Sequence, residues 1–124
     1  MGKKIEHFTD IDAWQHGHKL VLDVYRITKK FPKEELFGLT SQIRRAAVSI
    51  TANIAEGMGR YSYKDRIRFF YNSRGSIFEV ENFNLLAKDL KYLSESEFNV
   101  LQLQIEETRK TLNGFIGSTE KLIK

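Results

Sequence analysis

Residues 39–60 read LTSQIRRAAVSITANIAEGMGR and sort onto three faces of a helix rather than two. At about 100° per residue, one apolar stripe has the spacing of a core-facing surface. Its members are Ile43, Ala46, Ala47, Ile50 and Ile54. A second apolar patch of Val48, Ala52 and Ala55 lies beyond a polar stripe. The segment predicts a helix over about residues 40–57 whose polar stripe is at least partly buried, with Arg44 and Thr51 facing water.

The polar stripe of this helix comprises Gln42, Arg45, Ser49, Asn53 and Glu56. A buried polar group without a partner costs roughly 1–3 kcal/mol. We therefore expect these side chains to bond with one another or with the next helix, and Arg45 has two candidate partners: Glu56 on the same helix and Glu79 on the next. Such an Arg–Glu pair fixes the register between helices, and this structural role is the favoured interpretation. The alternative is an acid or anion-binding site made by the same residues.

Three further helices are predicted by apolar residues spaced three and four apart. They cover about residues 10–30, 63–91 and 95–122. Pro32, the only proline, ends the first because its ring excludes helical continuation. The last has an unbroken three-four repeat that suits a left-handed bundle.

Helix boundaries are also indicated by capping residues. Thr40 or Ser41 is expected to cap the helix at 40–57, and Gly57 to close it in the left-handed conformation. Two serines, each followed three residues later by an acid, have the spacing of a capping box. The two pairs are Ser62 with Asp65 and Ser94 with Glu97.

Length and composition predict one all-α domain spanning residues 1–124. Hydrophobic residues make up 41% and charged residues 29% of the chain, as in soluble globular proteins. Short connections make successive helices antiparallel, so we expect an up-down-up-down four-helix bundle. The absence of cysteine excludes disulfides and thiolate metal sites. With no apolar leader and no apolar run of membrane-spanning length, we expect a cytoplasmic protein without membrane contact.

The helix at 63–91 carries two apolar stripes. One is expected to face the core: Phe69, Ser73, Ser76, Val80, Phe83, Ala87 and Leu90. The other lies roughly opposite: Ile67, Tyr71, Phe78 and Leu85. A lone bundle has no use for a second stripe, and exposed apolar patches mark interfaces, so these residues predict a homo-oligomer interface. The alternative is an ordinary scatter of surface aromatics.

Positive charge is concentrated just after the 40–57 helix. The chain carries a net charge of +4, and residues 60–74 hold five basic residues against one acid. Cations neutralise phosphates and tyrosines stack on unpaired bases, so the segment is a candidate nucleic-acid site. The candidate residues are Arg60, Tyr61, Tyr63, Lys64, Arg66, Arg68 and Arg74. The alternative is a solvated helix start whose tyrosines pack against the bundle.

The sequence shows no clear pattern of a catalytic site or a metal site. The three histidines, His7, His16 and His18, have no carboxylates at the spacing of a di-iron bundle. His18 falls in an apolar row and is expected in the core or an interface. No glycine-rich phosphate loop occurs. We expect no enzyme, no catalytic residue, no cofactor and no metal.

A family resemblance rests on residues 31–60, FPKEELFGLTSQIRRAAVSITANIAEGMGR, and extends along most of the chain to Gly75, Ser76 and Glu79. This segment resembles the hallmark of bacterial four-helix-bundle proteins encoded by intervening sequences in large-subunit (23S) ribosomal RNA genes. The resemblance implies a ring-like homopentamer. Accessory proteins of diversity-generating retroelements are similar and work with a reverse transcriptase and nucleic acid. The expected partners are therefore other copies of the chain together with RNA or DNA, or alternatively a partner protein held by a scaffold that does not touch nucleic acid.

Overall fold

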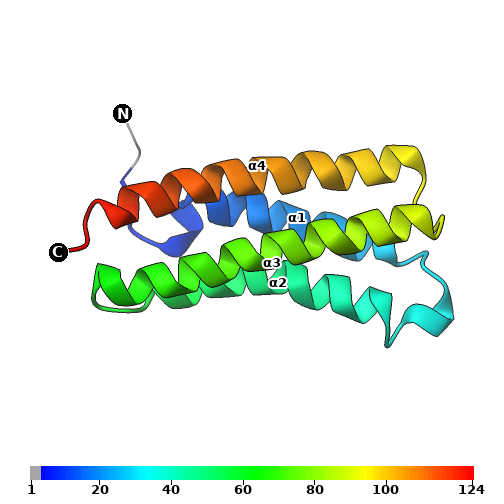
Figure 1. Ribbon diagram of the computed structural model, residues 1–124, viewed down its shortest axis with the longest axis horizontal. Helices are drawn as coiled ribbons and strands as arrows, with labels where there is room; N and C mark the ends of the chain where they lie inside the picture. Colours follow the sequence, from blue (N-terminus) through cyan, green and yellow to red (C-terminus); the bar gives the residue numbers. More distant parts are fainter. Residues whose placement is uncertain (1–3) are drawn as a thin grey trace.

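The computed structural model describes residues 4–124 and has four long helices. They are α1 (Asp12–Thr28), α2 (Leu39–Met58), α3 (Tyr63–Asp89) and α4 (Glu95–Glu120), with short 3-10 turns at Phe8–Asp10 and Lys33–Glu35. The described residues include no strand. Figure 1 shows the chain reversing direction at each connection, so that both ends of the chain and the α2–α3 connection lie at one end of the molecule. The expected all-α class is confirmed.

The core lies between four helices that each contact two others. α2 packs on α1 and α3, and α4 packs on the same two helices. Ile43, Ala47, Ile50 and Ile54 of α2 are fully buried, as their spacing predicts. The other helices contribute further large apolar side chains that are fully buried: Leu20, Val24, Phe70, Ile77, Val80, Leu101, Ile105 and Leu112.

Two residues expected on buried faces lie outside the core. In α1 the core row passes through Leu20 and Val24, so His18 is exposed in the single chain and stacks on the ring of Trp14 at 4.7 Å, and its place in an interface stays a prediction. In α3 the core face is rotated toward Phe70 and Ile77. Leu90, expected inside, is therefore exposed.

α2 and α3 approach each other closely at Gly57. A Cβ atom there would lie 2.7 Å from Cε1 of Phe70 and 3.0 Å from Cβ of Phe69. Gly57 is thus a packing residue inside α2, which continues to Met58, and it does not close the helix in a left-handed conformation. The absence of a side chain at this position lets the two helices meet and buries the Phe70 ring.

Of the three predicted helix caps, one forms in full, one forms in part and one does not form. Ser94 and Glu97 form both bonds of a capping box at α4. Ser62 accepts the amide hydrogen of Asp65, but the carboxylate of Asp65 pairs with Arg68 instead of reaching back. α2 begins at Leu39 with no cap from Thr40 or Ser41.

The start of α2 is held instead by Glu35. The backbone N–H of Leu39 donates to Oε1 of Glu35 over 3.1 Å. The other carboxylate oxygen accepts from the Tyr92 hydroxyl over 2.9 Å, across the junction to the α3–α4 connection. One carboxylate therefore serves both a helix start and a contact between connections.

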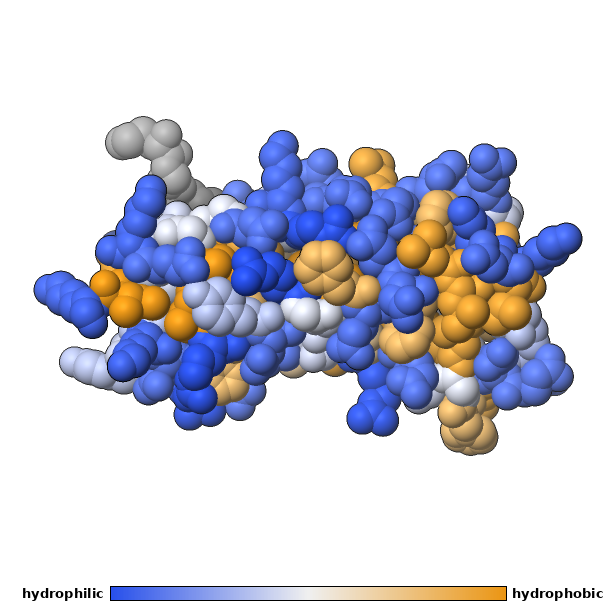
Figure 2. Space-filling model, viewed as in Figure 1, coloured by the Kyte–Doolittle hydropathy of each residue, from blue (hydrophilic) through white to orange (hydrophobic). Residues whose placement is uncertain are grey.

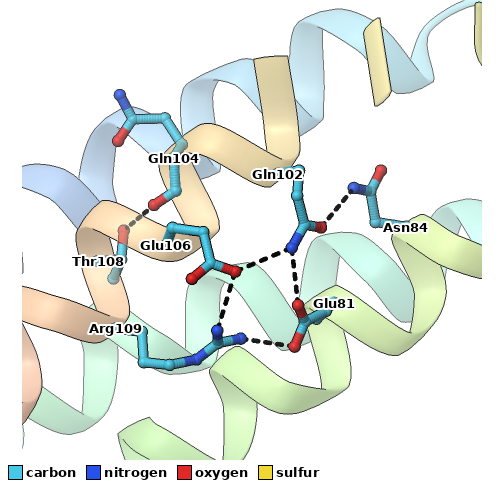
Figure 3. Close-up of polar contacts among 7 residues, drawn as sticks. All are labelled: Glu81, Asn84, Gln102, Gln104, Glu106, Thr108 and Arg109. Carbon is cyan, nitrogen blue, oxygen red and sulfur yellow. Dashed lines mark hydrogen bonds and ion pairs between the residues drawn. The ribbon is translucent and has the colours of Figure 1, made fainter. Parts of the chain in front are cut away.

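A polar cluster joins α3 to α4 (Figure 3). Arg109 donates to Glu81 over 2.5 Å and to Glu106 over 3.0 Å. Gln102 donates to both carboxylates and accepts from Asn84, which is fully buried. Buried polar groups of this kind specify one helix register because a slip would break several bonds together.

Within residues 4–124, no helix combines the length and apolar character that a membrane crossing requires.

Candidate nucleic-acid interface

The basic segment occupies the α2–α3 connection and the first turns of α3. Gly59 ends α2, and the Ser62 cap starts α3 at Tyr63, so Arg60 and Tyr61 lie in a tight link between two helices. The Tyr61 side chain is 100% exposed.

Arg60 and Arg68 converge on one aromatic ring. The guanidinium carbon of Arg60 lies 4.6 Å from the ring centroid of Phe69, and that of Arg68 lies 5.9 Å from it. Cation–π contacts of this length are attractive and fix the approach of the guanidinium to the ring. Phe69, which was not among the predicted site residues, thereby orients two of the predicted cations.

Each of these two arginines also has an acidic neighbour. Arg60 lies 3.6 Å from Glu56, and Arg68 lies 3.5 Å from Asp65. All four side chains are about half exposed or more, and exposed ion pairs contribute about 0–1 kcal/mol. A phosphate can therefore displace either carboxylate at little cost.

Lys64 completes the exposed set. It lies one helical turn before Arg68 on the same face, and within the described chain it makes no ion pair or hydrogen bond. We call Arg60, Tyr61, Lys64 and Arg68 the basic tip. The structure places Arg60 and Arg68 on the Phe69 ring, with Lys64 one turn before Arg68 and Tyr61 next to Arg60 in the chain.

The other three predicted residues lie elsewhere. Tyr63 and Arg66 line a cavity at the end of the bundle. Arg74 reaches α4, where it donates to Asn113 over 3.4 Å, and its guanidinium covers the ring of Tyr71. Residues two or six positions away from Arg68 point in other directions on a helix, so one basic run supplies three separate surfaces.

The polar stripe of α2 is mostly on the surface. Ser49 and Asn53 are half-buried and bond as expected: Asn53 donates to the Ser49 hydroxyl over 3.0 Å, and Ser76 of α3 donates to the same oxygen over 2.9 Å. Gln42, Arg45 and Glu56 are exposed. The expected burial therefore holds for the middle of the stripe and fails at its ends.

The expected Arg45–Glu79 ion pair does not form. Both residues line a polar hollow of about 280 Å³ with Gln42 and Ser49, yet among residues 4–124 neither side chain has a hydrogen bond or ion pair. Arg44, expected to face water, instead donates to Thr28 over 2.9 Å and covers the Tyr25 ring at 4.7 Å. The register-fixing arginine of α2 is thus Arg44 rather than Arg45.

Three of the four residues in the predicted interface stripe are exposed. Ile67 is only 6% exposed and belongs to the core, because it lies beside the buried Phe70. Phe78 is 55% exposed beneath the guanidinium of Arg109, and Leu85 is also exposed. Tyr71 is exposed, and its hydroxyl donates to Glu120 over 2.6 Å. That hydrogen bond is the main cause that raises the pKa of Tyr71 above its ordinary value.

A further apolar surface was missed by sequence reasoning. Leu86 and Leu90 are exposed and line one hollow with Glu35 and Gly38, and the two residues between Glu35 and Gly38 in the chain are also exposed: Leu36, and Phe37 at 93%. Figure 2 shows apolar atoms gathered at the end of the bundle opposite the chain termini. The signal available in the sequence was the Leu36–Phe37 pair between Pro32 and Gly38, in a stretch too short for a helix. No cluster of three or more potential metal-ligating side chains occurs within residues 4–124.

The fold and the basic tip define a small all-α protein of four helices with a cationic, aromatic link at one end. The chain belongs to the 23S rRNA-intervening sequence protein family, whose model matches residues 9–114. Among solved structures, it is similar to a protein of unknown function from the S23 ribosomal protein family of Bacteroides thetaiotaomicron VPI-5482. The identity is 20% and the TM-score 0.75, over 84% of this chain and 97% of that one, which shows a shared fold. Comparison with curated proteins gives no match.

Proposed function

We propose that this protein is a non-enzymatic, self-associating protein that binds nucleic acid through the basic tip. The observation that carries the proposal is the convergence of Arg60 and Arg68 on Phe69, beside the unpaired Lys64 and the fully exposed Tyr61. Three cations, two of them held on the half-buried Phe69 ring, together with the exposed ring of Tyr61 match a phosphate backbone with an unstacked base. This combination favours a single strand of RNA or DNA over a partner that is only acidic.

Self-association makes a weak site effective. Three phosphate contacts per subunit give modest affinity, but copies of the tip arranged around a ring engage one strand together. The family resemblance implies five copies of an antiparallel bundle. Support from the structure comes from the exposed Phe78 and Leu85 on α3 and from Arg45 and Glu79, which have no partner within the described chain. These are the groups that a neighbouring subunit would satisfy.

The test compares two triple variants of equal charge. One replaces Arg60, Lys64 and Arg68 by Ala; the control replaces Lys29, Lys33 and Lys110, which are exposed and have no ion pair within residues 4–124. Each lowers the net charge of +4 by three. Binding of a labelled oligothymidylate and of an oligouridylate is followed by fluorescence anisotropy at several salt concentrations.

The tip variant should weaken binding and reduce the slope of log K against log salt by about 2. The control should retain most of the wild-type affinity. Equal losses in the two variants would contradict a defined site and indicate attraction by net charge alone. Native mass spectrometry of the wild type reports the subunit number and any retained polymer in the same measurement.

A second candidate function is a scaffold for a partner protein. It is favoured by the exposed apolar residues at the other end of the bundle from the basic tip, where Leu86 and Leu90 line one hollow and Leu36 and Phe37 lie in the exposed α1–α2 connection. Exposed apolar clusters mark interaction sites. Purified protein whose ultraviolet spectrum shows no nucleic acid, and which binds neither oligonucleotide, would favour this function over the first.

A further inference from the structure

A cavity of about 380 Å³ opens at the end of the bundle that holds the chain termini. Its walls are largely apolar and include Met58, Phe70, Phe115 and Leu122. Figure 2 shows apolar atoms reaching the surface at this end, between the start of α3 and the end of α4. Cavities of this size with a few polar groups in an apolar lining are typical of small-molecule sites.

The cavity contains one cation, Arg66. Its Nε donates to the carbonyl oxygen of Arg60 over 2.8 Å, and its guanidinium lies 5.3 Å from the Tyr63 ring centroid. Both partners are neutral, whereas nearby Arg68 has a carboxylate neighbour. Within residues 4–124, the terminal nitrogens of Arg66 have no partner. The guanidinium is thus held in place while two of its nitrogens remain available to an anion.

A second cavity of about 440 Å³ adjoins the first. The two share Ile5, Phe115 and Ser118 in their linings. Asp10 and Asp12 line the second cavity, so its electrostatic character is opposite to that around Arg66. Charge therefore orients any ligand that spans both, with an anionic group at Arg66 and an uncharged body extending past Phe115.

We propose that this end cavity binds a free medium-chain fatty acid, with its carboxylate on Arg66 and its alkyl chain between Phe115 and Ile5. The charge arrangement excludes a cationic head group at Arg66, and the apolar walls match an alkyl chain better than a sugar or a nucleotide. The site uses no side chain of the basic tip, only the backbone carbonyl oxygen of Arg60 that holds Arg66, so it stands independently of nucleic-acid binding by the tip side chains.

The test measures binding of decanoate, below its micellar concentration, by isothermal titration calorimetry. Arg66→Gln should weaken decanoate binding roughly tenfold or more, because a charge-assisted bond is replaced by a neutral one. The same variant should bind the uncharged decanol as the wild type does. Lys64→Gln, which removes an exposed cation outside the cavity lining, should leave both affinities unchanged.

The location of the decanoate site is tested by methyl nuclear magnetic resonance and by a variant that blocks the cavity. Decanoate should shift the methyl signals of Leu122 and Ile5, and Ser118→Trp should abolish binding of both ligands by filling the junction of the two cavities. The inference is overturned if the wild type does not bind decanoate, if Arg66→Gln binds it as tightly as the wild type, or if the shifts fall elsewhere. Binding to lipid vesicles without binding of free decanoate would likewise overturn it and identify a membrane-contacting end.

Discussion

Arg109 Nη2 of α4 donates to Oε1 of Glu81 on α3 across 2.5 Å, with only 19% and 24% of the two side chains exposed. The guanidinium also lies over the Phe78 ring, 5.0 Å from its centroid, and Arg109 bonds to Glu106 on its own helix. A half-turn slip of α4 would separate the charges of Arg109 and Glu81 while keeping much apolar contact. The pair therefore favours one register among several with similar hydrophobic burial.

Removal of Arg109 should destabilise the fold more than removal of both partners. Arg109→Met leaves the Glu81 carboxylate largely buried without its cation, and we expect a loss of about 2 kcal/mol in the free energy of unfolding, between the values for exposed and buried pairs. The double variant Glu81→Leu with Arg109→Met should recover most of it. Urea denaturation measures the free energy of unfolding of the wild type, of Arg109→Met and of the double variant. A double variant less stable than Arg109→Met would contradict this account.

Gly57→Ala should cost about 2 kcal/mol of stability, because the new methyl group must displace the rings of Phe69 and Phe70. Gly75→Ala is the matched control, since nothing lies within 4 Å of its Cβ position inside α3. That substitution should stabilise the protein by roughly 0.5–1 kcal/mol through helix propensity. Thermal unfolding should show opposite shifts in the two variants.

The lowered pKa of Glu97 predicts part of the loss of folding stability at acidic pH. Its hydrogen bond with Lys30, together with bonds at the Ser94 cap, lowers its pKa below the ordinary value of 4.5. A carboxyl group with a depressed pKa contributes stability above its unfolded-state pKa and loses that stability as pH falls through the folded-state pKa. Glu97→Gln should be less stable at neutral pH, and its melting temperature should decline less below about pH 4.5. Identical pH profiles of melting temperature for the wild type and Glu97→Gln would show that Glu97 does not contribute to the acid sensitivity.

The raised pKa of Tyr92 predicts a loss of folding stability at alkaline pH. Its hydrogen bond to Glu35 is the main cause that raises its pKa above 10.0. A raised pKa stabilises the folded state below the unfolded-state pKa, and that stability is lost as pH rises through the folded-state value. Tyr92→Phe should therefore be less stable at neutral pH and lose less stability above pH 10. The control is Tyr61→Phe, whose ring is fully exposed and should leave both measurements unchanged.

The two adjacent arginines of α2 should behave differently. Arg44→Met removes the bond to Thr28 and the contact with Tyr25, and we expect a loss of about 1 kcal/mol in stability. Arg45→Met removes no contact within the described chain, so the unfolding free energy of the isolated subunit should change by less than about 0.5 kcal/mol. Native mass spectrometry should instead show fewer assembled subunits for Arg45→Met. An unchanged assembly would remove Arg45 from the proposed interface.

Local periodicity was sufficient for the helices, whose ends lie within two residues of the expected positions. Local periodicity could not predict contacts between residues that lie far apart in the chain. Glu35 holds the start of α2 from outside the helix, and Gly57 is explained by Phe70, thirteen positions later. Both depend on where another segment lies in space, which spacing along one helix does not contain.

The candidate site was recovered in part for the same reason. Lys64 and Arg68 share a helical face and meet at the tip, as an i, i+4 spacing requires. Arg66 and Arg74 belong to the same basic run, yet they point to the end cavity and to α4. The supporting role of Phe69 could not be anticipated because it depends on Arg60 approaching from the other side of the turn.

The close approach at Gly57 also determines where the positive charge is presented. It holds the end of α2 against the first turns of α3, and that placement lets Arg60 and Arg68 share the Phe69 ring. The geometry of the charged tip is therefore set by a residue that has neither charge nor side chain. Substitution of this glycine should alter how the protein meets a polyanion while every cation remains present, an effect that alanine scanning of basic residues alone would not detect.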